Sequence, residues 1–196
     1  MAEFGASPPP LSLIKDAPLL GFTTKRQLKA ADLWRDQPCV FMVVRRPGCN
    51  LCRAQAKALA DIRTQLTELG VGLAAVSHQD NSAEDFVNLY FGKSEGQQDS
   101  LYIDQTKAFY KAVGRGTLRT KGLLGMLSSK MWSNNSEANA IGATGNFSGD
   151  YSHLGGVLLV GKGEEGVLWS FQEVDFGDKA PLPSLLKACR QSVGKE

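Results

Sequence analysis

Apolar and polar residues alternate along this chain in patterns that predict both strands and helices. Residues 39–45 ("CVFMVVR") and 71–77 ("VGLAAVS") are continuous apolar runs next to proline or glycine, as in strands buried on both faces. Residues 100–104 form a shorter run of the same kind. Residues 155–173 contain two apolar runs separated by "KGEEG", which predicts a β-hairpin.

Helical periodicity appears between these runs. From residue 50 to residue 69, apolar side chains recur every three or four positions, and Gly70 follows as a typical helix end. Similar patterns predict helices at 82–91 and 181–191, the latter with proline in its first turn. Residues 23–36 ("TTKRQLKAADLWRD") also predict a short helix, with Thr24 as a possible N-cap.

The remaining stretches define the domain organisation. Residues 1–20 are rich in proline and predict a flexible lead-in, so that residues 21–196 form a single domain. Residues 114–150 combine apolar side chains at near-helical spacing with a run rich in glycine, asparagine and serine. We expect a packed helix and a surface loop there. The alternative is an apolar lid over a functional site.

The order of the elements predicts an α/β protein. Strands alternate with helices before a β-hairpin and a closing C-terminal helix, which together favour a thioredoxin-like fold with a central mixed sheet flanked by helices. Cys49 and Cys52 stand where the first of these strands turns into the first long helix. Chemistry in open α/β sheets gathers at the carboxyl ends of the strands.

The composition of the chain argues against several classes of function and location. The 196 residues have 42% hydrophobic content and a net charge of +2, which gives no electrostatic support for a nucleic-acid partner. No apolar run is long enough to predict a transmembrane segment, and the N-terminus lacks the pattern of a signal peptide. We therefore expect a cytoplasmic location.

The two cysteines at the helix start have surroundings that favour a thiolate. A helix N-terminus provides unsatisfied N–H groups and a partial positive charge next to Cys49. Arg45, Arg46 and Arg53 add cations, although strand alternation allows at most one of Arg45 and Arg46 to face the sulfur directly. Cys49 is the expected nucleophile, and Cys52, three residues on, the thiol that captures oxidised Cys49 as a disulfide.

Other interpretations of the pair remain open. The two thiols could simply be packed, or could bind a metal, with His78 and His153 as the remaining ligands. No second short-spaced cysteine pair completes a zinc site, so we predict no metal. Cys39 and Cys189 stand alone, and the sequence assigns neither a role.

Several segments together resemble one family. They are "VVRRPGCNLCRAQA", "LGVGLAAV", "LYIDQTKAFY", "GNFSGDYSHLGGVLLVG" and "FGDKAPLPSLLKA". This set, between about Leu28 and Cys189, resembles the peroxiredoxin-like 2 group of the alkyl hydroperoxide reductase and thiol-specific antioxidant superfamily. The resemblance implies a thioredoxin-like fold and a redox pair at Cys49 and Cys52. It also implies an antioxidant role or reduction of prostaglandin-type endoperoxides, with electrons from NADPH or a thioredoxin system.

The chain departs from related families at two places. Ordinary peroxiredoxins have a threonine or serine three residues before the reactive cysteine and a proline four residues earlier still, where this chain has Arg46 and Met42. That difference predicts less efficient peroxide reduction. Thioredoxins place a cis-proline before the strand that faces the cysteines, whereas this chain has Gly155 and Gly156, which would leave backbone room for a substrate or satisfy a turn.

The sequence therefore predicts a thiol-dependent oxidoreductase that reduces a hydroperoxide or lipid endoperoxide through a Cys49–Cys52 disulfide cycle. We expect no bound cofactor, and an external reductant such as thioredoxin or a similar NADPH-linked dithiol. The alternative function is a non-catalytic redox-sensing or interaction module with a reversible disulfide.

Overall fold

A mixed sheet forms the centre of the molecule. The computed structural model describes residues 7–92, 99–120, 142–146, 148–150 and 152–195. Within these residues a seven-stranded sheet has the order β2-β1-β5-β4-β3-β6-β7. Its strands are β1 (Pro18–Gly21), β2 (Gln27–Lys29), β3 (Cys39–Val43), β4 (Gly72–Ser77), β5 (Leu101–Ile103), β6 (Gly156–Val160) and β7 (Val167–Gln172). The strands predicted from apolar runs are thus confirmed as β3 to β7.

The central strands are buried on both faces, as their continuous apolar sequence requires. β3 runs parallel to β4 and antiparallel to β6. Side chains alternate along β3, so Val40 and Met42 enter one core while Phe41 and Val43 enter the other. The sheet therefore separates two hydrophobic cores, and each needs a covering layer.

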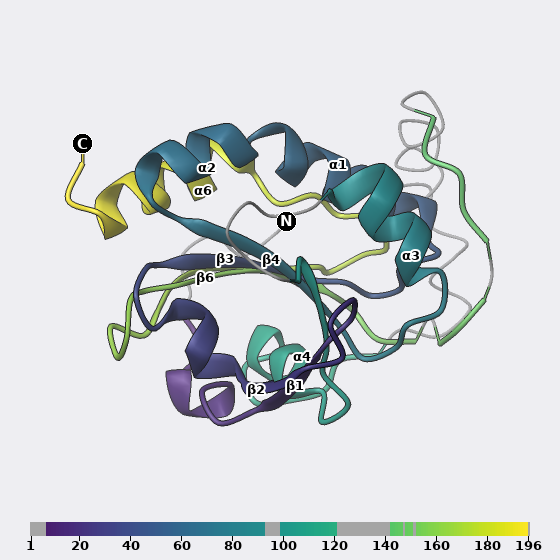
Figure 1. The fold of residues 1–196 in the computed structure, drawn as a ribbon, viewed down its shortest axis with the longest axis horizontal. Coiled ribbons are helices and arrows are strands. Elements are labelled where there is room, and N and C mark those ends of the chain that lie inside the picture. The colour runs from purple at the N-terminus through teal and green to yellow at the C-terminus, as the bar shows by residue number, and fades with distance from the viewer. Residues whose placement is uncertain (1–6, 93–98, 121–141, 147, 151, 196) are drawn as a thin grey trace.

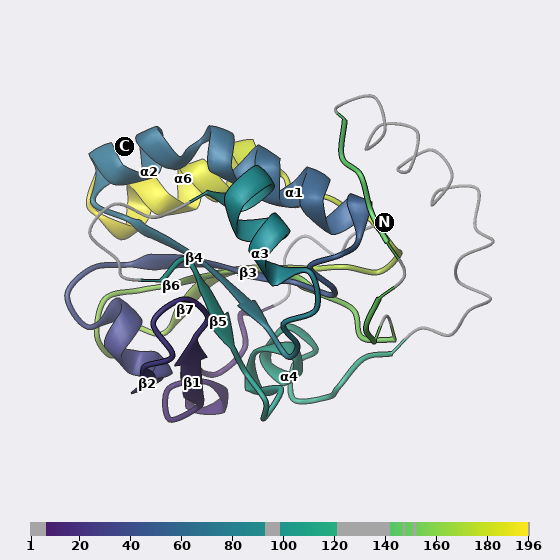
Figure 2. The same ribbon diagram turned by 45° about the vertical axis from the view of Figure 1, so that its right-hand side comes forward.

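Helices provide both layers (Figure 1). α1 (Asn50–Asp61), α2 (Arg63–Leu69) and α6 (Leu182–Ser192) cover one face together with the short α3 (Ala83–Asp85) and the π-helical turn η3 (Phe86–Phe91). The other face is covered by α4 (Ala108–Val113) and the 3-10 helices η1 (Leu11–Leu13) and η2 (Ala30–Trp34). Figure 2 shows β1, β2 and β5 on the α4 side of the molecule. The predicted mixed sheet with flanking helices, hairpin and closing helix is confirmed.

The long helix predicted for residues 50–69 is present but interrupted. α1 ends at Asp61 and α2 begins at Arg63, with Ile62 at the junction between them. Gly70 ends α2 in the left-handed conformation, as predicted, and donates its N–H to the carbonyls of Leu66 and Thr67. Among the described residues, none of the helices combines the length and apolarity needed to cross a membrane.

Two expectations about the N-terminal region are wrong. Residues 11–20 are not a loose lead-in: they form η1 and most of β1, and Ile14 and Leu19 are buried in the core. Residues 27–29 are not helical but pair with β1 as strand β2, and only Ala30–Trp34 is helical. Thr24 is no helix cap, because the helix begins at Ala30 with Lys29 as its N-cap residue; the Thr24 hydroxyl instead donates to Asp99.

The segment at 114–150 is only partly described. Its residues 121–141, on which the expected helix and the alternative lid both depend, lie outside the described residues. α4, just before this segment, has no counterpart among the predicted elements. Phe109 and Tyr110 of α4 are buried in the core beneath β3.

Candidate redox site

The cysteine pair lies at the turn that joins β3 to α1. Cys49 is the N-cap residue of α1, and its carbonyl accepts the N–H of Arg53, so the helix begins directly after this cysteine. Cys52 follows in the first turn. The two are free thiols, and only 4% and 3% of their surfaces are exposed. The predicted pair is therefore assembled, but in a buried position.

Arg45 is the cation that contacts Cys49. Its Nη2 donates to the Cys49 Sγ over 2.7 Å, and its guanidinium lies 4.4 Å from the centre of the Phe176 ring. The arginine is itself buried, so little water screens its charge. A hydrogen bond from a cation to sulfur stabilises a thiolate more than a thiol. Cys49 therefore has a fixed counter-ion.

The pKa values of the two cysteines are shifted in opposite directions. The hydrogen bond from Cys52, reinforced by the charge of Arg45, holds the pKa of Cys49 well below its usual range despite burial. The same hydrogen bond, together with burial, raises the pKa of Cys52 well above its usual range. Cys49 is thus the thiolate and Cys52 the thiol that donates to it. The catalytic roles expected for the two cysteines stay a prediction.

Arg46 and Arg53 stabilise the loops around the site. Arg46 Nη1 donates to the carbonyl of Ser148 over 3.2 Å, although its charge also lowers the pKa of Cys49 from a greater distance. Arg53 Nε donates to the carbonyl of Pro47 over 2.9 Å, and its Nη1 donates to the carbonyl of Thr144 over 2.9 Å. Among the contacts of the described residues, the hydrogen bond to the Cys49 sulfur comes from Arg45, in line with the expectation that one of Arg45 and Arg46 would face it.

The residues at 142–146 and 148–150, called here the covering loop, pack on the cysteine turn. The N–H of Asn146 donates to the carbonyl of Gly48 over 2.8 Å. A Cβ on Gly145 would lie 2.7 Å from the N atom of Asn50, so this loop approaches the start of α1 too closely for any side chain there. The covering loop contributes to the burial of the cysteines.

Gly155 and Gly156 do not leave room for a substrate. A Cβ on Gly155 would meet the carbonyl oxygen of Val43, and one on Gly156 would meet that of Phe171. Both positions are buried between neighbouring strands of the sheet. The glycines are required because backbones approach closely, which corrects their assignment as substrate-adjacent residues.

Glu173 is a site residue that sequence reasoning did not find. It follows β7, is 7% exposed, and its Oε2 accepts the N–H of Gly155 over 2.8 Å. Burial raises the pKa of Glu173 to about 7, while the positive charge of Arg45 opposes that rise. The carboxyl group therefore shares Arg45 with the Cys49 thiolate and can exchange a proton near neutral pH. No local motif marks this glutamate, because its neighbours come from other strands.

Glu173 predicts a specific dependence of stability on pH. The pKa of Glu173 is about 7 in the folded protein and 4.5 in the unfolded chain. Between these two pH values the folded state binds more protons than the unfolded state, so the free energy of unfolding falls as pH rises from about 4.5 to about 7. Glu173→Gln stays neutral, so it should gain stability relative to the wild type across this range, by at most about 3 kcal/mol. Urea unfolding from pH 5 to pH 8 measures the difference. The exposed Glu84→Gln is the control, and a difference that does not change with pH would contradict the assignment.

The other cysteines and the histidines belong to other elements than the turn with Cys49 and Cys52. Cys39 begins β3 and is buried in the core. Cys189 is buried in α6, where burial raises its pKa to about 12. His78 and His153 lie beside each other and Asp150, with their ring centres 5.0 Å apart, so the structure groups them in a cluster of their own.

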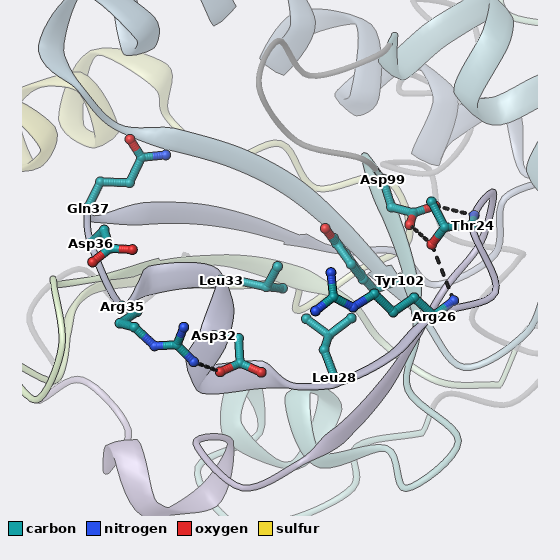
Figure 3. Close-up of a pocket in the computed structure, with 10 residues that line it drawn as sticks. All are labelled: Thr24, Arg26, Leu28, Asp32, Leu33, Arg35, Asp36, Gln37, Asp99 and Tyr102. Carbon is teal, nitrogen blue, oxygen red and sulfur yellow. Dashed lines mark hydrogen bonds and ion pairs between the residues drawn. The ribbon is translucent and has the colours of Figure 1, made fainter.

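A separate pocket of about 480 Å³ lies at the β2 edge of the sheet (Figure 3). Its lining side chains interact with one another: Arg35 forms an ion pair with Asp32, and the Thr24 hydroxyl donates to Asp99. None of the residues that line it belongs to the cysteine turn. The pocket is not part of the redox site.

Comparison with known proteins identifies the family. Residues 58–175 match the model of the AhpC/TSA antioxidant enzyme family. Over 168 residues the chain is 38% identical to peroxiredoxin-like 2A of Rattus norvegicus, an alignment that covers 85% of this chain and 69% of the relative. The chain belongs to the peroxiredoxin-like 2 family. The Danio rerio member is 38% identical over 171 residues, covering 86% of this chain and 76% of its own length.

Solved structures show the fold of this peroxiredoxin-like chain. The bacterioferritin comigratory protein of Xanthomonas campestris superposes with a TM-score of 0.60 at 12% identity, covering 96% of this chain and 99% of its own. A peroxiredoxin-like protein of Aquifex aeolicus gives a TM-score of 0.56 at 13% identity, covering 97% and 88%. The thioredoxin-like fold predicted from the order of strands and helices is therefore confirmed.

Proposed function

We propose that this peroxiredoxin-like protein reduces a hydroperoxide, or the O–O bond of a lipid endoperoxide, through a Cys49–Cys52 dithiol/disulfide cycle. The observation that carries the proposal is the 2.7 Å hydrogen bond from the buried Arg45 to the Cys49 sulfur. A thiolate at the start of a helix, with a fixed cation, is the form of cysteine that attacks peroxides. Membership of this chain in the AhpC/TSA antioxidant enzyme family supports a redox role for the protein.

The cycle has three steps. With a hydroperoxide, the Cys49 thiolate attacks the terminal peroxide oxygen, the O–O bond breaks, and the products are Cys49 sulfenic acid and an alkoxide that leaves as an alcohol after taking up a proton. The Cys52 thiol then attacks the Cys49 sulfur, and the hydroxyl of the sulfenic acid leaves as water with the proton from Cys52. With an endoperoxide, the first attack would give a sulfenate ester on Cys49, from which the Cys52 thiol would displace the substrate as a diol. An external dithiol reduces the resulting disulfide by thiol exchange. Each turn oxidises one external dithiol and reduces one peroxide.

The geometry favours particular reactants. Because both sulfurs are less than 5% exposed and the covering loop lies over the turn, a small peroxide has the easiest access. The Xanthomonas structural neighbour has been studied for alkyl peroxide reduction activity, which supports organic hydroperoxides as a second class. Electrons would come from thioredoxin or a similar dithiol. A lipid endoperoxide would require the covering loop to move away from α1.

Burial of the sulfurs also favours a second function. A disulfide that forms slowly in a covered site, and that changes how the covering loop packs, would suit a redox sensor with no multiple turnover. Hydrogen bonds from Arg46 to Ser148 and from Asn146 to Gly48 connect the loop to the turn that would reorganise. The two functions differ in the number of peroxide molecules consumed per protein.

The test is a turnover assay on the reduced protein. Hydrogen peroxide and an organic hydroperoxide are each added with thioredoxin, thioredoxin reductase and NADPH, and peroxide consumption is followed while mass spectrometry maps the disulfide. We expect many equivalents consumed and a Cys49–Cys52 disulfide. One equivalent consumed with the same disulfide would favour the sensor. Pairing through Cys39 or Cys189 would overturn both functions.

A further inference from the structure

His78 presents an unshared nitrogen lone pair in a buried position. The Tyr110 hydroxyl donates to the carbonyl of Val44 over 2.6 Å, so its oxygen can only accept from His78. This oxygen accepts the backbone N–H of His78 over 3.1 Å, and the ring Nδ1 of His78 also lies 3.1 Å from it. We assign the proton of the neutral imidazole to Nδ1, which makes that contact a second hydrogen bond to the same oxygen. Nε2 is left with its lone pair and has no hydrogen-bond partner among the described residues, while the side chain is only 7% exposed.

His153 presents a lone pair in the same direction. Its Nε2 lies 2.7 Å from the Lys107 ammonium, which can only donate, so Nε2 is the accepting nitrogen. Its side chain is 6% exposed. The chain contains two histidines in all, and both bring Nε2 close to Asp150. Unlike His78, His153 has its Nε2 paired with Lys107, and its Nδ1 has no hydrogen-bond partner among the described residues.

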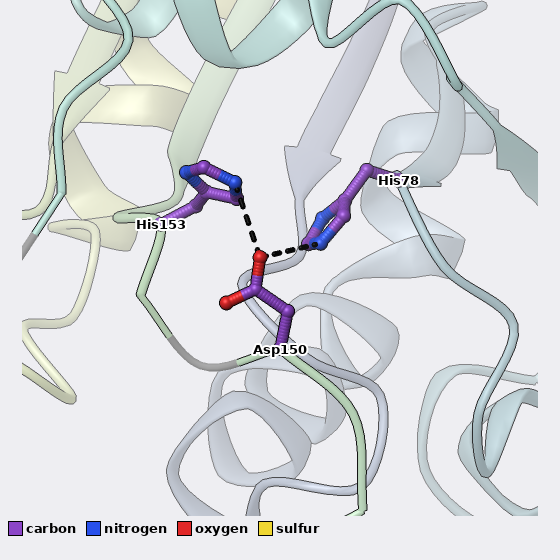
Figure 4. Close-up of side chains that lie close together, drawn as sticks. All are labelled: His78, Asp150 and His153. Atoms are coloured by element: carbon purple, nitrogen blue, oxygen red, sulfur yellow. Dashed lines mark ion pairs between the residues drawn. The ribbon is translucent and has the colours of Figure 1, made fainter.

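Both lone pairs face one carboxylate oxygen (Figure 4). Asp150 Oδ2 lies 3.6 Å from His78 Nε2 and 3.2 Å from His153 Nε2, and a carboxylate only accepts hydrogen bonds. The possible ligand atoms of the three residues all lie within 4.8 Å of one another. Three acceptors that converge repel one another unless a cation lies between them.

We propose that His78, Asp150 and His153 form a binding site for one zinc-class dication, independent of the cysteine pair. Ligand atoms about 2.0–2.2 Å from a tetrahedral ion are about 3.3–3.6 Å apart, which matches the two measured separations. Two neutral imidazoles and one carboxylate are typical ligands for zinc and its first-row neighbours. Asp150 is 44% exposed, so water has access to the remaining position.

The outer contacts orient these ligands as metal sites require. Tyr110 receives the Nδ1 proton of His78, which fixes both the ring and its tautomer. The second carboxylate oxygen, Asp150 Oδ1, accepts from both the N–H and the hydroxyl of Ser152, at 2.8 and 2.7 Å. Gln79 holds the main chain of Asp150 through two hydrogen bonds, at 2.7 and 2.8 Å.

Lys107 is the competitor for the site. Its ammonium lies against His153 Nε2 and now supplies the positive charge among the three acceptors. The residue is partly exposed at the start of α4, so its side chain can move into solvent when an ion binds. Removing the ammonium should therefore tighten metal binding, which is the opposite of what loss of a ligand does.

Metal binding would also affect the covering loop. Asp150 is the last described residue of that loop, and Arg46 holds Ser148 two positions before it. Gln79, which binds Asp150, also reaches the carbonyl of Arg45 over 3.4 Å. A bound ion would fix the far end of the loop and so stabilise the cover over the cysteine turn.

The experiment measures zinc binding by equilibrium dialysis, on reduced protein from which metal has been removed with a chelator. The measurement is made on the wild type and on the Cys49→Ser/Cys52→Ser double variant, which lacks the thiol ligands. Cobalt replaces zinc in a second arm, because thiolate ligands give cobalt intense charge-transfer bands that nitrogen and oxygen ligands do not. Variants are His78→Ala, His153→Ala, Asp150→Asn and Lys107→Met. The control is Asp80→Asn, an exposed carboxylate on the same loop as His78.

We expect one ion per chain in both cysteine backgrounds, without thiolate bands in the double variant. Each ligand variant should weaken binding at least about tenfold, Lys107→Met should tighten it, and Asp80→Asn should leave it unchanged. Nitrogen-detected NMR of the two histidine rings should show both Nε2 signals move with zinc, independently of any variant's folding. Zinc that disappears with the cysteines, or rings that do not respond, would overturn the proposal.

Discussion

Replacing Cys49 by serine should lower peroxide turnover by more than about a thousandfold, because a serine hydroxyl does not ionise where a thiol does. The Arg45 hydrogen bond would then meet a neutral oxygen, and no thiolate sulfur would lie beside Arg45 to attack the peroxide. Peroxide consumption with thioredoxin, thioredoxin reductase and NADPH measures the loss. Cys189→Ala is the matched control, since this thiol is buried in α6 and not in the turn that joins β3 to α1.

The Cys52→Ser variant separates the two thiol roles. It keeps the Cys49 thiolate beside Arg45, so one equivalent of peroxide should still react. The sulfenic acid on Cys49 then has no neighbouring thiol, and should be trapped by dimedone or oxidised further. If Cys49→Ser retained substantial turnover, or if sulfenic acid formed on Cys52 instead, the assignment of nucleophile and resolving thiol would be wrong.

Features that depend on local sequence were predictable. The apolar run at 39–45, the turn at Pro47-Gly48 and the periodicity after Asn50 are enough to place a cysteine pair at a strand-to-helix turn. That turn required no knowledge of the rest of the chain. By contrast, residues 27–29 have good helix formers, yet they pair with β1, because tertiary pairing overrides a weak local preference.

Features that depend on distant parts of the chain could not be predicted. Glu173 reaches Gly155 across a hairpin, and Asp150 reaches His78 from the covering loop. The sequence offers three arginines near Cys49, but which of them contacts the sulfur depends on how β3 ends. The structure selects Arg45 because Phe176, far along the chain, packs against its guanidinium.

Removing the Arg45 charge should reduce the reactivity of Cys49 near neutral pH. A hydrogen bond to a charged group is worth about 1.5–3 kcal/mol, so Arg45→Met should lower the thiolate population about 10- to 100-fold where Cys49 is partly protonated. The Cys52 hydrogen bond remains and preserves part of the depressed pKa. The rate of alkylation by iodoacetamide, measured from pH 4 to pH 10, gives the apparent pKa directly.

The shape of that pH profile distinguishes loss of charge from general disruption. Loss of the Arg45 charge moves the profile to higher pH and leaves the rate at high pH close to that of the wild type, where Cys49 is ionised in both proteins. Arg45→Lys should restore part of the shift. Arg46→Met should change the profile less, because the Arg46 side chain donates to Ser148. An unshifted profile for Arg45→Met, or a larger shift for Arg46→Met, would show that the 2.7 Å contact is not what ionises Cys49.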